Sequence, residues 1–116
     1  MGDNEKIRTA VDKLMENAIT YTKENGKVTA KLELTGDMIH FEVRDTGIGI
    51  PATEQHRVFT RFFRGSNATT MQQDAFGLGL FIAKNFIEQQ GGKIGFESKE
   101  GEGSVFWFDV PVSHEH

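Results

Sequence analysis

The chain has 116 residues, no cysteine, 37% hydrophobic residues and a formal net charge of −4. This length favours one domain with a single packed core, and the lack of cysteine excludes disulfides and thiolate metal sites. No apolar run is long enough to span a bilayer, no signal-peptide pattern opens the chain, and the scattered basic residues form no nucleic-acid patch. We therefore expect a cytoplasmic domain over residues 1–112 that binds neither nucleic acid nor membrane, with a disordered tail over 113–116.

The first half of the chain predicts a helix followed by a hairpin. Apolar residues recur at helical spacing from about residue 3 to residue 22. Residues 28–35 and 39–44 then alternate between apolar and polar side chains, which is typical of half-buried strands. Gly36-Asp37 between them predicts a tight turn.

The second half predicts two helices and a second hairpin. A short helix should follow Pro51, with Val58, Phe59, Phe62 and Phe63 on its apolar side, and 65–76 should be a mobile loop. An amphipathic helix should then end at Gly91-Gly92, before strands over 93–98 and 104–110. The predicted fold is a two-layer α/β sandwich, with helices on one face of a mixed, mostly antiparallel sheet.

Two glycine clusters are the candidate functional features. Asp45–Pro51 follows a strand with an acid and two glycines, and Gly77–Leu80 opens a helix. Glycine lets a backbone approach a ligand closely, and a helix start offers free N–H groups to an anion. The pair indicates a nucleotide pocket, although an Asp-Thr-Gly sequence after a strand is also a common turn.

Five segments in this order resemble the ATP-binding catalytic domain of sensor histidine kinases. That family shares its Bergerat-type fold with type II topoisomerases, heat-shock 90 chaperones and MutL repair proteins. The phenylalanine-rich third segment separates the kinases from the ATPase branches. The resemblance covers residues 2–112, and its segments are 14–22, 45–51, 58–64, 77–80 and 101–106.

The resemblance implies roles for individual residues in binding ATP and Mg²⁺. Asp45 should accept a hydrogen bond from the adenine amino group, and Gly47, Gly49 and Ile50 should form the adenine wall. Asn17 should ligate magnesium through its amide oxygen and act in catalysis beside Glu16. The remaining residues expected to contact the nucleotide are Lys13, Tyr21, Arg64, Gly77, Leu78, Gly79 and Leu80.

The chain departs from the usual kinase pattern at four positions. Lys13 stands where these kinases usually carry Asn, and Thr20 stands where they usually carry Lys. Ala75 and Phe76 replace Gly and then Ser or Thr. Positions 13, 17 and 20 share one helix face, so Lys13 either reaches the phosphates or repels magnesium.

Histidine kinases of two-component systems phosphorylate a histidine on a separate helical dimerisation domain. Of the four histidines, only His114 is followed by an acid, Glu115, and it lies in the expected disordered tail instead of an acceptor helix. We therefore expect a protein histidine kinase catalytic domain that donates its γ-phosphoryl group to a partner helix, and through it to a response regulator. The alternatives are an engineered or degenerate nucleotide-binding module without turnover, and a serine kinase of the anti-sigma type, against which the phenylalanine-rich segment argues.

Overall fold

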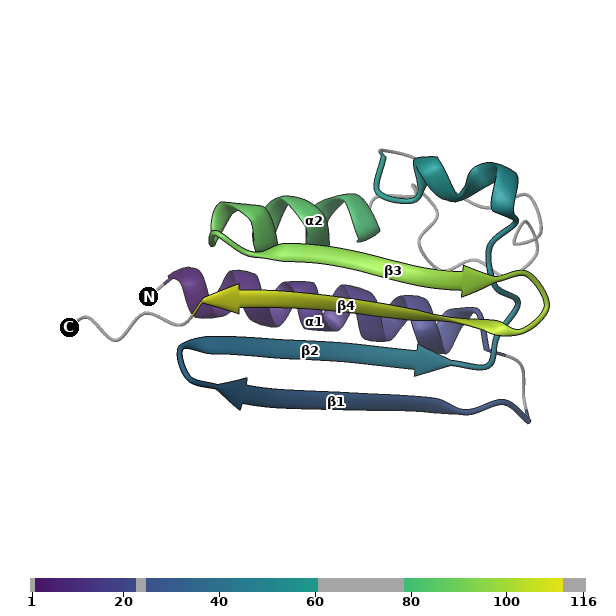
Figure 1. Ribbon diagram of the computed structural model, residues 1–116, viewed down its shortest axis with the longest axis horizontal. Helices are drawn as coiled ribbons and strands as arrows, with labels where there is room; N and C mark the ends of the chain where they lie inside the picture. Colours follow the sequence, from purple (N-terminus) through teal and green to yellow (C-terminus); the bar gives the residue numbers. More distant parts are fainter. Residues whose placement is uncertain (1, 23–24, 61–78, 112–116) are drawn as a thin grey trace.

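The computed structural model describes residues 2–22, 25–60 and 79–111 (Figure 1). In those ranges neither α-helix is long and apolar enough to cross a bilayer. The elements are α1 (Gly2–Thr20), β1 (Val28–Thr35), β2 (Met38–Asp45), the 3₁₀ helix η1 (Ala52–Arg57), α2 (Gly79–Gln89), β3 (Lys93–Lys99) and β4 (Gly103–Pro111).

The four strands form one sheet in the order β1-β2-β4-β3. Both sequence-adjacent pairs are hairpins, and β4 inserts between β3 and β2, so every described pairing is antiparallel. The parallel component of the expected mixed sheet does not occur among the described strands. The register places Phe41 opposite Phe108 and Val43 opposite Phe106.

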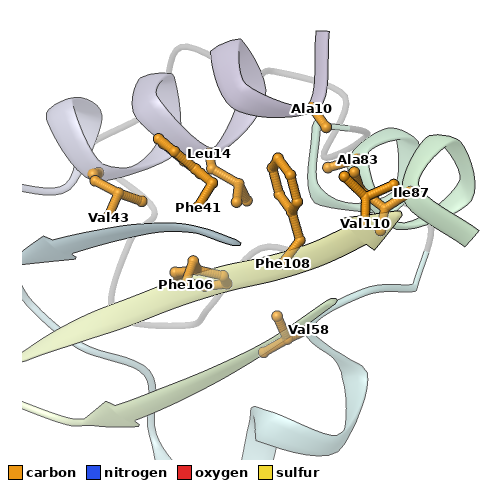
Figure 2. Close-up of a cluster of buried hydrophobic side chains, with 11 residues drawn as sticks. Ala10, Leu14, Phe41, Val43, Val58, Ala83, Ile87, Phe106, Phe108 and Val110 are labelled. Atoms are coloured by element: carbon orange, nitrogen blue, oxygen red, sulfur yellow. The ribbon is translucent and has the colours of Figure 1, made fainter. Parts of the chain in front are cut away.

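The core lies between the sheet and the two helices, which cover one face, so the predicted two-layer sandwich is confirmed. Figure 2 shows its side chains gathered between these layers. Successive side chains of a strand point to opposite faces of the sheet. The buried apolar side chains of β2 and β4, which occupy every second position, therefore face the helices. Their fully buried partners on the helices are small or aliphatic: Ala10, Leu14 and Ala18 from α1, and Ala83 and Ile87 from α2.

The segment after Pro51 is helical but shorter than predicted. It is a 3₁₀ helix that ends at Arg57, so Val58 and Phe59 follow the helix instead of lying on it. Val58 is buried, and the Phe59 ring meets Phe96 and Phe106 edge-on, at centroid distances of 5.8 and 6.3 Å. Phe59 is therefore an anchor to the core, as expected, while Phe62 and Phe63 lie outside the described residues.

Residues 28–35 form a strand as predicted, but the prediction that this strand is half-buried is wrong. β1 is a strand, but Leu32 and Leu34 are 67% and 65% exposed. They stand opposite Phe41 and Ile39, on the side that the helices cover elsewhere. Figure 1 shows the reason, because β1 is the edge strand and lies beyond both helices.

The uncovered face of the sheet carries an ionic cluster centred on His40. Its Nδ1 lies 2.6 Å from an Asp109 carboxylate oxygen and its Nε2 lies 3.0 Å from a Glu42 carboxylate oxygen. Only the doubly protonated ring can donate to both. The hydrogen bond to Glu42 and then that to Asp109 raise the pKa of His40, and the same contact with His40 lowers the pKa of Glu42.

We expect unequal stability losses from truncating apolar side chains on β4 and β1. Phe108→Ala empties a buried site and should cost about 3–5 kcal/mol of unfolding free energy. Leu34→Thr changes an exposed side chain and should cost less than about 0.5 kcal/mol. Urea unfolding measures both, and similar losses in the two variants would show that β1 is covered in solution.

The His40 cluster should make stability depend on pH. A raised folded-state pKa contributes stability that is complete below the ordinary value of 6.5 and is lost as pH rises through the folded-state pKa. Thermal melts from about pH 6 to about pH 8.5 should therefore show a falling Tm for the unchanged chain. His40→Gln should flatten that dependence, and an equally steep fall in the variant would contradict the assignment.

Candidate functional site

Four structural elements point to one end of the molecule. A hydrogen bond of 2.7 Å from Lys6 to Gln89 joins the start of α1 to the end of α2, so the helices are antiparallel. The end of α1 and the start of α2 therefore point to the same end as the loop after β2 and the β3–β4 turn (Figure 1). The sequence-predicted segments at residues 14–22, 45–51 and 101–106 are brought together there.

The loop Asp45–Pro51 is held by backbone contacts on both sides. On the α1 side, the Ile48 N–H donates to the Tyr21 carbonyl at 3.2 Å. On the hairpin side, the Gly101 N–H donates to the Ile48 carbonyl at 2.8 Å. The loop is thus tied to both neighbours through one residue, by hydrogen bonds made within the protein.

The loop glycines are required by these contacts. A Cβ atom on Gly47 would lie 2.1 Å from the Tyr21 carbonyl oxygen, and one on Gly49 would lie 2.1 Å from that of Lys99. Gly49 also has a φ of +69°, a left-handed conformation that favours glycine. The close approach observed at both positions is to neighbouring backbone, so these glycines shape the loop before any ligand arrives.

Asp45 is a buried charged group at this end, with 5% of its surface exposed. One carboxylate oxygen accepts a hydrogen bond of 2.8 Å from the Gly47 N–H. Burial raises the pKa of Asp45, while the N–H groups of Gly47 and Ser104 stabilise the ionised form and lower it. The carboxylate is therefore oriented by the backbone and keeps lone pairs for a further donor.

Three polar residues that the sequence analysis did not select adjoin this loop. Ser98 of β3 and Ser104 of β4 lie on the same face of the sheet as the apolar residues Phe96 and Phe106. Both serines are at the strand ends nearest the loop. The Ile50 N–H donates to the Ser98 hydroxyl, and Gln55 donates to the Ile50 carbonyl. The sequence did offer a signal for the two serines, because each stands at a position where the alternation of its strand would place an apolar residue.

The predicted residues of α1 lie beside the loop or on the helix surface. Asn17 and Tyr21 are half-buried, and the carbonyl of Tyr21 holds the loop. Glu16 is exposed and lies 4.0 Å from the ammonium of Lys13, one helical turn away. Such an exposed pair is weak, so Lys13 is not locked in this position.

The second glycine cluster is described only in part. Gly79 and Leu80 are the first residues of α2, and Leu80 packs against the core. Arg64, Gly77, Leu78, Ala75, Phe76 and the expected loop over 65–76 lie outside the described residues.

Comparison with known proteins gives concordant matches in sequence and structure. Residues 2–114 match the family described as "Histidine kinase-, DNA gyrase B-, and HSP90-like ATPase". Sensor histidine kinase WalK of Bacillus subtilis (strain 168) is 36% identical over 97% of this chain and 19% of its own length. The chain therefore spans about a fifth of that relative.

Two solved structures share the fold. The mycobacterial sensor histidine kinase MprB superposes with a TM-score of 0.81 at 29% identity, over 96% of this chain and 75% of that chain. Full-length ShkA in complex with AMPPNP gives a TM-score of 0.75 at 28% identity, over 93% of this chain and 22% of that chain.

The fold and these matches define a catalytic domain of the histidine kinase type. The chain belongs to the family of histidine kinase-, DNA gyrase B- and HSP90-like ATPases. The resemblance inferred from five short segments is thereby confirmed over nearly the whole chain.

We expect Gly49→Ala to destabilise the protein more than a glycine replacement with the same backbone strain. Gly36 is the matched control, because its φ is +61° but a Cβ there meets nothing within 4 Å. Gly36→Ala should cost about 1–2 kcal/mol for the left-handed conformation alone. Gly49→Ala adds a collision with the Lys99 backbone, and equal losses of unfolding free energy in urea would contradict this account.

Proposed function

We propose that this chain binds ATP at the end where the loop Asp45–Pro51 meets the two helices. The observation that carries the proposal is the buried, backbone-oriented carboxylate of Asp45 inside a loop that contacts within the protein hold in place. Family membership supports it, and so does the AMPPNP complex of ShkA, whose catalytic domain shares this fold.

The adenine ring would lie against the loop. Asp45 would accept a hydrogen bond from the exocyclic amino group, with Gly47, Gly49 and Ile50 forming the wall and Tyr21 packing at its side. The phosphates would meet the start of α2, where the positive end of the helix dipole favours anions. The phosphate contacts proposed there are Arg64, Gly77, Leu78, Gly79 and Leu80.

Magnesium fits this end if the nucleotide supplies most of its ligands. Mg²⁺ commonly takes one or two protein oxygens together with phosphate oxygens and water. The half-buried amide of Asn17 offers such an oxygen on the helix face next to Tyr21. Bound magnesium would neutralise charge on the phosphates during transfer.

The proposed reaction is transfer of the γ-phosphoryl group to a histidine nitrogen on a helical dimerisation domain of the longer protein. Glu16 and Asn17 are the proposed catalytic residues, and a response regulator would then receive the group. His40 is unsuited as acceptor, because both of its ring nitrogens contact carboxylates on the face away from the helices. We assign this role to one domain over residues 1–112, working where cytosolic ATP is available.

Titration calorimetry with ATP, and with GTP as the competing base, tests the adenine assignment. Asp45→Asn should weaken ATP binding at least about fivefold, because an amide can present a donor to the adenine amino group where the carboxylate only accepts. Asp12→Asn on the exposed surface of α1 is the matched control and should bind as the unchanged chain does. Equal affinity in Asp45→Asn would remove Asp45 from the site.

Lys13 gives a test of the metal assignment. Lys13→Asn should increase the magnesium-dependence of ATP binding, because it removes a cation that competes with the metal and adds an amide oxygen. Calorimetry with and without magnesium measures the change. Weaker binding of the variant without magnesium would instead show that Lys13 pairs with phosphate, and unchanged values would show that it faces solvent.

Turnover is tested by adding a purified helical acceptor domain from a histidine kinase of this family. Labelled phosphate from ATP should appear on the acceptor histidine in the presence of magnesium. Tight ATP binding without transfer would favour the alternative of a nucleotide-binding module that has lost turnover.

A further inference from the structure

The backbone of Ile50, near the end of the loop Asp45–Pro51, is bound by two side chains from other elements. Its N–H donates to the Ser98 hydroxyl of β3 at 2.8 Å. Its carbonyl accepts from the Gln55 amide of η1 at 3.0 Å. Both polar groups of one loop residue are therefore satisfied by residues outside the loop.

The hydroxyl of Ser98 uses its full hydrogen-bonding capacity here. Besides the Ile50 N–H, it lies 2.7 Å from the Ser104 hydroxyl and 3.2 Å from the Gly103 carbonyl. A hydroxyl has one donor and two acceptor positions. Donation to the Gly103 carbonyl, with acceptance from Ile50 and Ser104, satisfies all three.

Both N–H groups of the Gln55 amide are used as donors. Its nitrogen lies 3.0 Å from the Ile50 carbonyl and 3.0 Å from the Ser98 carbonyl. These two acceptors belong to the loop and to β3, so each amide hydrogen has one partner. Gln55 therefore joins the loop to the strand that already holds it through Ser98.

This bonding continues to Asp45 through the sheet register. Ser98 stands opposite Ser104 on β4, and Ser104 stands opposite Asp45 on β2. The three residues form one polar row at the end of the helix-facing side. Contacts that fix Ile50 are thus connected, across three adjacent strands, to Asp45, the residue proposed to accept a hydrogen bond from the adenine amino group.

We propose that Ser98 and Gln55 are positioning residues that hold the loop Asp45–Pro51 in its nucleotide-accepting form. The inference rests on the proposed function, since it assigns these side chains to the same nucleotide site. A loop that is ordered before binding loses less conformational entropy when the ligand arrives. Without either side chain we expect the fold to persist but the loop to become less ordered. The loop would then lose conformational entropy when the nucleotide binds, which weakens binding.

The test compares two replacements of Ser98 that have nearly the same shape. Ser98→Val removes the hydroxyl and should weaken ADP binding about tenfold, whereas Ser98→Thr keeps it and should stay within about twofold. Gln55→Ala should match Ser98→Val, which keeps the proposal testable if one variant folds poorly. Ile94→Val is the control on the same strand and face, away from the loop, and should bind normally.

Amide hydrogen exchange supplies a second readout. Exchange at Gly49 and Ile50 without ligand should accelerate in Ser98→Val and Gln55→Ala, and not in Ser98→Thr or Ile94→Val. Unchanged ADP affinity in Ser98→Val and Gln55→Ala, with the unchanged chain binding ADP, would overturn this inference alone. Absence of ADP binding by the unchanged chain would overturn the proposed function itself, and the inference with it.

Discussion

The register between β2 and β4 is the constraint on which the rest of the structure depends. Once Phe41 stands opposite Phe108 and Val43 opposite Phe106, the next inward pair is Asp45 with Ser104. These two apolar pairs supply the core beneath α1 and α2, and the polar pair of Asp45 and Ser104 ends it. A shift of one residue would turn the core side chains to the open face and carry Asp45 away with them. Stability and the candidate site are therefore set by one alignment of two strands.

The loop after Asp45 illustrates how a binding surface is prepared without its ligand. Gly47 and Gly49 let the loop approach the backbone of Tyr21 and Lys99, closer than any side chain would allow. Hydrogen bonds through Ile48 and Ile50 then tie the loop to α1, β3 and η1. Most of the conformational entropy of the loop is thus lost on folding, where the hydrophobic core offsets it.

The two faces of the sheet differ in what covers them and in the side chains they carry. On the covered face, helices bury β2 and β4 but leave Leu32 and Leu34 of β1 exposed. On the open face, His40, Glu42 and Asp109 form an ionic cluster that links β2 to β4 and titrates with pH. The candidate site lies at one end of the covered face, so the charge state of this cluster and the chemistry of the site are spatially separate.

The sequence by itself determined the elements and the family. Within the part of the chain that the structure describes, apolar spacing located both α-helices and all four strands, because local periodicity records which side chains must be buried together. Segments such as Asp45–Pro51 indicated the family, because five short segments in a fixed order can be recognised from sequence alone. Only the tertiary structure decided that β1 is uncovered, since burial of an edge strand depends on where the helices lie. It also revealed what Ser98 and Gln55 do, because the Ile50–Ser98 and Gln55–Ser98 hydrogen bonds join residues more than 40 positions apart, and no local pattern records such contacts.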